Sequence, residues 1–147
     1  MKPLSYIILL TVLNGCSVSQ SQFHPVDNKE FTFSKINKNL PFSKNELYLK
    51  SNYWIVDYFL NPKEVVQYSD KQEGVIKGIY KERYSIFYQS TLPFQFTIKV
   101  KDSFAKIDVK PRQQLSVNEK GKREVIPLLK GKLMILLRSY HKKMQEE

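Results

Sequence analysis

The feature that most restricts the fold is strict alternation of apolar and polar side chains in two neighbouring runs. These runs are residues 94–100 and residues 105–109. Successive side chains of a strand point to opposite faces, so a period of two predicts two half-buried strands. Asp102-Ser103 separates the runs and predicts a tight turn, and Pro111 ends the second strand. We therefore expect an antiparallel hairpin with one buried face and one wet face.

Three further strands are predicted upstream of this hairpin. Residues 64–69 and 75–84 are rich in β-branched and aromatic residues. The loop between them ends in Gly74, which tolerates positive φ, so the two strands should form another hairpin. Residues 31–36 predict a first strand. The candidates for its inward-facing side chains are Phe31, Phe33 or Ile36.

Two segments have the periodicity of amphipathic helices. The first should begin at Ser43, because Ser43-Lys44-Asn45-Glu46 has the spacing of a capping box, and it should run to about Leu60. The second should begin at Glu124, after a polar turn over residues 118–123. Pro127 would then lie in the first helical turn, where its missing N–H costs little.

The predicted order of elements is β-α-β-β-β-β-α. Strands that alternate need a cover on one face only, and two amphipathic helices can supply it. We expect an α+β domain over residues 30–147. Its architecture should be two-layer, with an antiparallel sheet of about five strands and both helices packed on one face.

The N-terminus indicates export. Residues 1–15 contain one positive charge at Lys2 and an apolar stretch about half as long as the roughly 20 residues of a spanning helix. The stretch ends in Leu13-Asn14-Gly15-Cys16, which resembles the bacterial lipobox, with Asn14 where a small or hydroxylated residue is usual. The resemblance implies that the signal peptide is cleaved before Cys16 and that Cys16 receives the diacylglycerol and acyl (palmitate-type) chains of a lipoprotein.

The residues after Cys16 predict how the domain is held. Residues 16–29 are polar and lack periodicity, which is typical of a flexible tether beyond the lipidated cysteine. Ser17, rather than Asp, follows the cysteine. By resemblance to the enterobacterial sorting rule, this implies the outer membrane, facing the periplasm, while other membrane faces of the cell envelope stay open.

The charge narrows the range of partners. The chain has a formal net charge of +10, which favours phospholipid headgroups, lipopolysaccharide, acidic polymers or acidic proteins. Export argues against nucleic acid as a partner. A lysine-rich solvated surface that selects no partner would give the same composition. The oligomeric state is left open by the sequence.

No set of residues predicts catalysis. Cys16 is the only cysteine, and His24 and His141 have neither the spacing nor the partners of a metal site. Glycine-rich phosphate loops are absent from the sequence. We therefore expect no enzyme activity, no cofactor and no metal. A less favoured alternative is hydrolysis of an envelope polymer through an acid such as Asp57 or Asp70.

One candidate binding surface combines aromatic and basic residues near the end of a predicted strand. Such residues can stack on sugars or bind acidic groups. Cross-strand packing would explain the same aromatic residues. The candidate residues are Tyr80, Lys81, Arg83, Tyr84 and Tyr88.

Three motifs resemble one family. They are the tryptophan-bearing helix around residues 53–59, the Asp70-x-x-x-Gly74 hairpin and the strand-turn-strand over residues 98–107. Together they are similar to an exported bacterial family known as a domain of unknown function with a TBP-like fold. The similarity would cover about residues 30–144. It implies the fold and supplies no catalytic residues, and the name TBP-like implies no DNA binding here.

These observations favour a membrane-anchored lipoprotein that is a non-enzymatic binding or structural module of the cell envelope. The lipid anchor would provide the membrane association, and an envelope protein or an anionic envelope component would be the further partner. The alternative is an inhibitor or immunity-type lipoprotein directed against an external factor.

Overall fold

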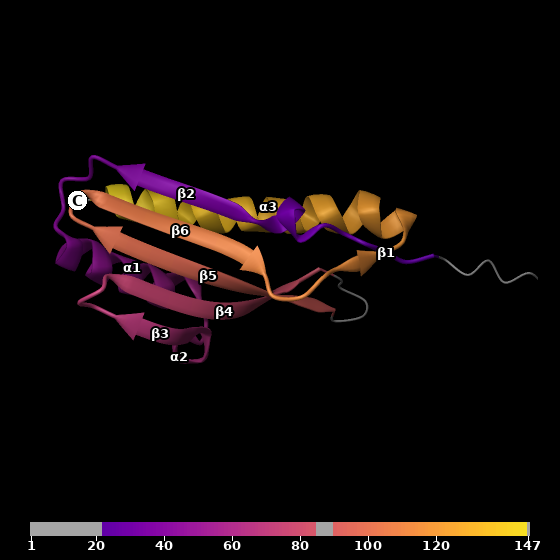
Figure 1. Ribbon diagram of the computed structural model, residues 1–147, viewed down its shortest axis with the longest axis horizontal. Helices are drawn as coiled ribbons and strands as arrows, with labels where there is room; N and C mark the ends of the chain where they lie inside the picture. Colours follow the sequence, from indigo (N-terminus) through magenta and orange to yellow (C-terminus); the bar gives the residue numbers. More distant parts are fainter. Residues whose placement is uncertain (1–21, 85–89, 147) are drawn as a thin grey trace, which may run out of the picture.

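The structure is a computed structural model that describes residues 22–84 and 90–146 of the chain. It contains a main sheet, a small second sheet, two long helices and two short helical turns (Figure 1). In chain order the elements are β1 His24–Pro25, the 3-10 helix η1 Asn28–Phe31, β2 Phe33–Lys38, α1 Lys44–Tyr58, α2 Pro62–Val65, β3 Val66–Asp70, β4 Val75–Arg83, β5 Thr91–Lys101, β6 Phe104–Pro111, β7 Ser116–Val117 and α3 Glu119–Gln145.

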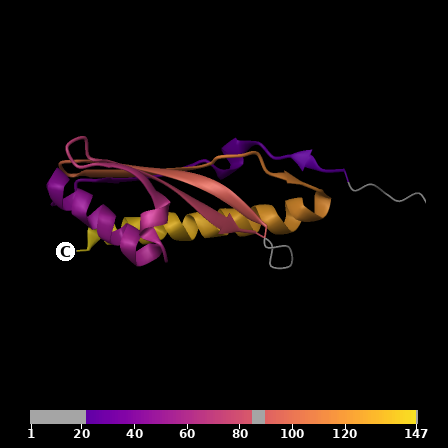
Figure 2. The ribbon, with the colours of Figure 1, turned by 90° about the horizontal axis from the view of Figure 1, so that it is seen from below.

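The main sheet has five antiparallel strands in the order β2-β6-β5-β4-β3, and β1 pairs with β7 in the small sheet. Both α1 and α3 lie on the same face of the main sheet (Figure 2). We call the opposite face the open face, because no helix of the described chain covers it. The predicted two-layer α+β architecture is confirmed.

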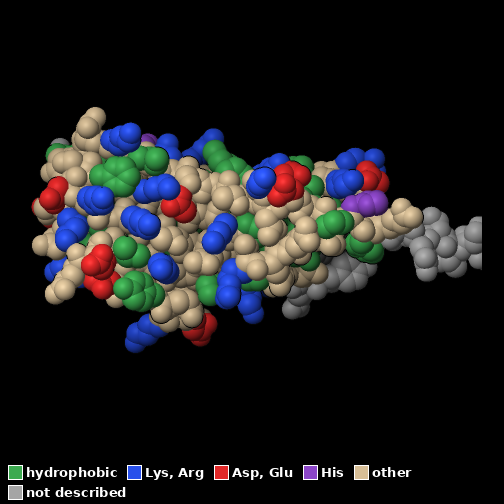
Figure 3. Space-filling view, in the orientation of Figure 1, with side chains coloured by type: hydrophobic (Ala, Val, Ile, Leu, Met, Phe, Trp, Pro, Cys, Tyr) green, Lys and Arg blue, Asp and Glu red, His purple; other side chains and the backbone are tan. Residues whose placement is uncertain are grey.

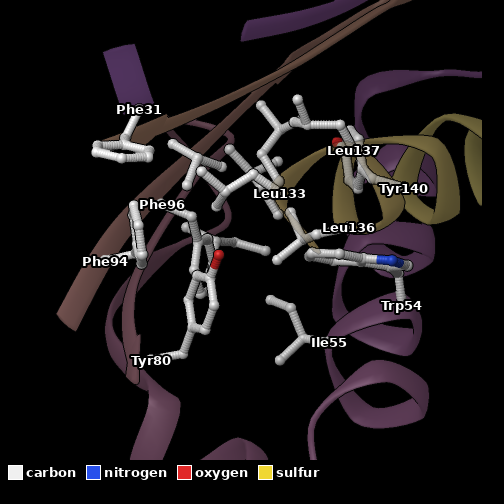
Figure 4. Packing of buried hydrophobic residues seen from close by; sticks show 14 of the residues in the cluster. Phe31, Trp54, Ile55, Tyr80, Phe94, Phe96, Leu133, Leu136, Leu137 and Tyr140 are labelled. Carbon is white, nitrogen blue, oxygen red and sulfur yellow. The ribbon is translucent and has the colours of Figure 1, made fainter. Parts of the chain in front are cut away.

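The core lies between the helices and the covered face of the sheet. Figure 4 shows Phe94 and Phe96 of β5 directed toward the side chains of α1 and α3. The ring of Trp54 on α1 contacts the ring of Tyr140 on α3 edge-on, with 5.1 Å between centroids. Its Nε1 donates a hydrogen bond to Ser139 Oγ over 3.0 Å. These contacts fix α1 against α3 above the sheet.

Both predicted hairpins are present. Asp70 Oδ1 accepts a hydrogen bond from the Glu73 backbone N–H over 2.9 Å within the first hairpin loop. Gly74 ends that loop with φ of +68°, and a Cβ there would lie only 2.4 Å from the Val100 carbonyl oxygen. Glycine is therefore needed at this position both for its backbone angle and for the close approach of β5.

The predicted N-terminal boundary is wrong. Residues up to Lys29 were expected to form a tether, but His24 pairs with Val117, and the Val26 N–H donates to the Leu115 carbonyl over 2.8 Å. Val26 is buried, so the folded part begins at His24 rather than at residue 30. Local composition did not predict this pairing because the partner strand lies about ninety residues later in the chain. Residues 1–21, including the predicted signal and Cys16, lie outside the described residues.

The first strand of the main sheet also differs from its prediction. Phe31 is buried as expected, but it belongs to η1 and precedes β2. Ile36, one of the expected inward-facing residues, is 46% exposed. It lies opposite Lys106 on the open face, because pairing of β2 with β6 sets which side chains face the helices.

The start of α3 is a further correction. The helix begins at Glu119 rather than at Glu124, because Asn118 Oδ1 accepts a hydrogen bond from the Gly121 N–H over 2.8 Å and caps the helix. The predicted turn over residues 118–123 is therefore mostly helical. Pro127 lies inside the helix and not in its first turn, so packing of the following apolar residues must offset its missing N–H.

The capping box of α1 is confirmed, but its C-terminal boundary is not. Ser43 N–H donates to Glu46 Oε2 over 2.7 Å, and the Ser43 side chain accepts from the Glu46 N–H. The helix ends at Tyr58, two residues before the predicted end. Pro62 then begins the single turn α2, so the next strand begins at Val66 rather than at residue 64.

Candidate functional site on the open face of the sheet

The open face of the main sheet is lined by lysine and arginine. Alternation along each strand sends one set of side chains to the helices and the other set to the open face. Figure 3 shows blue lysine and arginine side chains spread over this face, with few red acidic ones. The strand register places the following cations there: Lys38, Lys77, Lys81, Arg83, Lys99, Lys101, Lys106 and Lys110.

The register brings two of these lysines directly opposite each other. Lys99 of β5 pairs with Lys106 of β6, and side chains in this relation approach closely on one face. Like charges in such a pair are destabilising. Lys106 Nζ lies 2.8 Å from Asp108 Oδ1, which also accepts a hydrogen bond from the Ser34 hydroxyl. Lys106 is thus partly neutralised, whereas Lys99 has no ion-pair partner within the described residues.

Some lysines of the helix layer form ion pairs. Lys130 pairs with Glu30 at 2.9 Å, Lys132 pairs with Glu82 at 2.6 Å, and a third pair joins Lys143 to Asp57. Within residues 22–84 and 90–146, Lys106 is the only cation of the open face that forms an ion pair. Lys63, Lys120 and Lys142 of the helices are also without an ion pair in the described chain, so the open face is distinguished by the number of cations that share one continuous surface.

A shallow hollow of about 590 Å³ lies in the middle of this face. Lys77 Nζ sits 5.4 Å from the centroid of the Tyr68 ring at one side of it, and this is a cation–π distance. The Tyr68 hydroxyl donates to Asp70 Oδ2 over 3.3 Å, and the negative charge of Asp70 raises the pKa of Tyr68. The hollow offers amines, hydroxyls and an amide as donors. Those donors come mainly from Tyr68, Lys77, Gln95, Thr97, Lys99 and Lys110.

This arrangement can bind anions. Amines and hydroxyls on a broad, open surface can contact phosphate or carboxylate groups through charge-assisted hydrogen bonds. Two carboxylates of the face are already bound, since Asp108 pairs with Lys106 and Asp70 accepts a hydrogen bond within its hairpin turn. Glu73 also lines the edge of the hollow. The hydrogen bond from the Glu73 N–H is the largest cause of a lowered pKa at Asp70, so that carboxyl stays ionised rather than available as an acid.

The binding surface predicted from the sequence is divided by the structure. Tyr80 is 7% exposed and faces the helices, while Lys81 and Arg83 are exposed on the open face. Tyr84 is half-buried against the core, and Tyr88 lies outside the described residues. Alternation along β4 causes the division, because Tyr80 and Lys81 must point to opposite faces. Only the two cations remain part of the candidate site.

Sequence reasoning missed most of the site. Lys77, Lys99, Lys101 and Lys110 were visible only as the polar members of alternating strands. The signal that could have found them is that lysine recurs at the polar positions of three strands that adjoin in the sheet. Reading it requires the strand order, since lysines on separate strands form one surface only when those strands are neighbours.

The residues considered for catalysis or metal binding have structural partners. Asp57 is bound by Lys143 on the helix layer, and His24 belongs to β1. His141 Nδ1 contacts Asn37 Oδ1, and burial together with the nearby Lys35 charge lowers the pKa of His141. Over the described part of the chain, no group of three or more His, Cys, Asp or Glu residues could hold a metal ion.

A second exposed feature is an apolar stripe along the outer side of α1. Its first three residues are spaced by four and three positions along one side of α1, and Leu60 follows just after the helix ends. Each is at least about half exposed, and Leu60 is fully exposed. We call this set the α1 stripe. It consists of Leu49, Tyr53, Val56 and Leu60. Among the helices described, none is long and apolar enough to cross a membrane.

Two solved structures have a similar fold. A DUF4468 family protein from Bacteroides ovatus ATCC 8483 aligns with a TM-score of 0.52 and 15% identity, covering 74% of this chain and 85% of that one. A TBP-like protein from Parabacteroides distasonis ATCC 8503 aligns with a TM-score of 0.50 and 10% identity, covering 75% and 92%. At such low identity these likenesses bear on the fold alone. No curated protein matches the chain.

The family model for the domain of unknown function DUF4468 with TBP-like fold matches residues 35–111, which run from β2 through the end of β6. The matched segment therefore contains α1 and the main sheet except for the first two residues of β2. The family resemblance expected from the tryptophan-bearing helix and the two hairpins is confirmed. This chain belongs to the DUF4468 family of domains of unknown function with a TBP-like fold.

Proposed function

We propose that this protein is a lipid-anchored module of the bacterial cell envelope that binds an anionic envelope component through the open face of its sheet. The observation that carries the proposal is the gathering of eight lysine and arginine side chains on one face of the sheet. The strand register places these cations on one surface, and all of them except Lys106 are without ion pairs in the described chain. The proposed role is binding and not catalysis.

Electrostatics supports an anionic ligand. A surface that gathers charges of one sign raises the local concentration of ligands of the opposite sign and speeds their association. Lys99 and Lys106 lie opposite each other, and the repulsion between their charges destabilises the fold. An anion bound between them would reduce this repulsion. Binding should weaken as salt is raised, because exposed charges are screened.

The proposed anchor is Cys16, on the strength of the lipobox formed by Leu13 to Cys16. With the fold beginning at His24, the tether comprises only residues 17–23. Seven residues span at most roughly 25 Å when fully extended. The domain would therefore act close to the membrane surface, which for Ser17 after the cysteine is the outer membrane facing the periplasm.

Fractionation of cells tests the anchor. Wild-type protein should be found in the membrane fraction at the mass of a cleaved and acylated chain. Cys16→Ser should leave the chain unprocessed and without the acyl mass. If the substituted chain has the same mass and the same acylation as wild type, the proposed anchor is wrong.

Binding is tested by capture from envelope extracts. The full-length chain should retain an anionic envelope component at low salt and release it as salt increases. Lipopolysaccharide, anionic vesicles and zwitterionic vesicles serve as separate defined probes. A chain that binds none of them, or that binds all of them equally at every salt concentration, would contradict the proposed function.

The second candidate function, an inhibitor or immunity-type lipoprotein, draws on the α1 stripe. Exposed apolar residues gathered along one helix are typical of protein interfaces. Val56→Glu should abolish binding of a protein partner at that helix and leave anion binding by the open face unchanged. A hydrolase role has less support, because Asp57 and Asp70 are already engaged by Lys143 and by the hairpin turn.

A further inference from the structure

The path of the chain near its first described residues relates the anchor to the open face. In Figure 2 the segment of β1 and η1 lies on the side of the molecule where the sheet is exposed, with α3 on the other side. His24 is therefore on the same side as the open face, and it is the last folded point before the seven-residue tether. A membrane reached through that tether would be near the open face rather than near the outer side of α3.

We propose that the open face lies against the anionic headgroups of the membrane that carries the anchor, so that α1 and α3 face away from the bilayer. This inference rests on the proposed function and deepens it by naming the ligand. The phosphate groups of the lipid surface are the anions, and the cations of β4, β5 and β6 are their partners. The domain would then have a fixed orientation on the membrane.

The spacing of the cations suits a layer of phosphates. Residues two apart on one strand are separated by about 6.8 Å, and neighbouring strands lie about 4.8 Å apart. Lys99 and Lys101 on β5 follow this spacing, and Lys77 and Lys110 on the flanking strands widen the array. A lysine near an anionic membrane surface strengthens binding by about fivefold. Several such lysines acting together would orient the domain without inserting any residue into the bilayer.

A membrane fits this surface better than a free polymer for two reasons. The hollow at the centre is shallow and open, so the face offers no enclosed groove for a chain to follow. In addition, a tether of roughly 25 Å keeps the face permanently near the lipid surface. An intramolecular encounter of this kind has a high effective concentration, so modest contacts suffice.

Lysine footprinting of the anchored protein tests the orientation. The lipidated, processed protein is placed in vesicles of phosphatidylcholine alone, or of phosphatidylcholine mixed with phosphatidylglycerol, and its amines are acetylated and located by mass spectrometry. On the anionic vesicles, Lys99, Lys101 and Lys110 should react at least about fivefold more slowly than on zwitterionic ones. Lys120 and Lys142, which are exposed on α3, should react equally on both.

Paired variants provide the control. In the full-length Cys16→Ser chain, Lys99→Gln with Lys101→Gln should lower partitioning into anionic vesicles by about 25-fold. Lys120→Gln with Lys142→Gln removes the same charge from α3 and should leave partitioning unchanged. The loss should shrink between about 0.1 M and about 1 M salt, as the Debye length falls from about 10 Å to about 3 Å.

Two outcomes would overturn the inference. One is equal reactivity of the open-face lysines on both kinds of vesicle, and the other is protection of the α3 lysines in their place. Suppose that one of these outcomes is found, but the variant with Lys99→Gln and Lys101→Gln still loses binding to a soluble anionic polymer. The proposed function then stands, and only the proposed orientation on the membrane is wrong. If the variant loses neither polymer nor vesicle binding, the proposed function fails as well.

Discussion

At the scale of single residues, the closest packing in the sheet occurs at Gly78 of β4. A Cβ there would lie 2.3 Å from Phe96 Cζ and 2.8 Å from the Val65 carbonyl oxygen. Phe96 is fully buried against the rings of Trp54 and Phe59 and cannot move aside cheaply. Gly78 therefore allows an aromatic ring from β5 to cover the backbone of β4, where any larger residue would displace it.

Gly78→Ala should destabilise the fold by about 1–3 kcal/mol, because the added methyl group forces the ring or the strand to shift. Gly131→Ala is the matched control, since a Cβ at that helical position meets nothing within 4 Å. It should stabilise the protein by up to about 1 kcal/mol. Urea unfolding of both variants measures the difference. Equal effects of the two substitutions would contradict the packing described for Gly78.

Tyr80 supplies a second residue-level prediction. Its hydroxyl is buried and has no hydrogen-bond partner in the described chain, and burial raises its pKa far above the usual range. Tyr80→Phe should therefore leave the free energy of unfolding unchanged or slightly increased. Tyr140→Phe, by contrast, removes a 3.1 Å hydrogen bond to Ser51 and should cost about 1 kcal/mol. Thermal unfolding distinguishes the two, and a larger loss for Tyr80→Phe would show that its hydroxyl has a partner.

At the scale of secondary structure elements, the N-terminal cap of α1 could be predicted because it is local. Ser43 and Glu46 are three residues apart, and their reciprocal hydrogen bonds require no other part of the chain. Ser43→Ala should cost about 1 kcal/mol in urea unfolding. Asn45→Ala is the control, since Asn45 is exposed and next to the cap without belonging to it. Alanine has the higher helix propensity, so the control should lose no stability, and a similar loss in both variants would contradict the assignment of the loss to the cap.

Packing of α3 against β2 should depend on pH. His141 of α3 contacts Asn37 of β2, and burial, followed by the Lys35 charge, lowers the pKa of His141 below its usual 6.5. A lowered pKa means that the unfolded chain binds the proton more tightly. The stabilising contribution is therefore complete above pH 6.5 and is lost as the pH falls through the folded-state pKa.

The control for that pH dependence is His141→Gln, which keeps a polar side chain and cannot titrate. The difference in unfolding free energy between wild type and the variant should narrow as the pH falls below 6.5. An NMR titration of His141 should place its pKa below the value for a solvated histidine. A pKa at or above that value would refute the assignment.

Elements whose formation depends on distant partners were the ones that the sequence predicted poorly. The hairpins over residues 64–84 and 94–110 were found because alternation and turn residues are local signals. The pairing of β1 with β7, which ends the tether at His24, joins segments that are far apart in the chain. The start of α3 was predicted too late for another reason. Gly121 and Pro127 are unfavourable inside a helix and indicate a later start, although Asn118 is the residue that caps it.

At the scale of the whole molecule, the fold class could be predicted from the sequence, because the alternating strands and the amphipathic helices show which faces need cover. The candidate site could not be predicted in this way. Alternating strands with two amphipathic helices imply one covered face and one exposed face. Which lysines share the exposed face depends on the strand order β2-β6-β5-β4-β3, which no single strand encodes. Whether a lysine is neutralised depends on a carboxylate elsewhere in the fold, as for Lys132 and Glu82. The net charge can therefore be read from the sequence, whereas its distribution over the surface depends on the fold.

The gathering of cations on the open face gives the two layers different roles. The helix layer stabilises the fold through its core contacts and its paired charges. The open face contributes little to the core and keeps its positive charge available, and such charge is costly unless it meets an anion. If this division is correct, removal of open-face lysines should leave stability unchanged or improve it while binding is lost.

The most direct test compares two triple variants of equal charge for binding to a soluble anionic envelope polymer. Lys77→Gln, Lys99→Gln and Lys110→Gln lie on the open face, whereas Lys63→Gln, Lys120→Gln and Lys142→Gln lie in helices. Titration calorimetry at low salt should show that the open-face variant binds at least about tenfold more weakly than wild type, or about 1.4 kcal/mol. The helix variant should bind like wild type. Equal losses in the two variants would mean that net charge alone drives binding, and would contradict the assignment of the site to the open face.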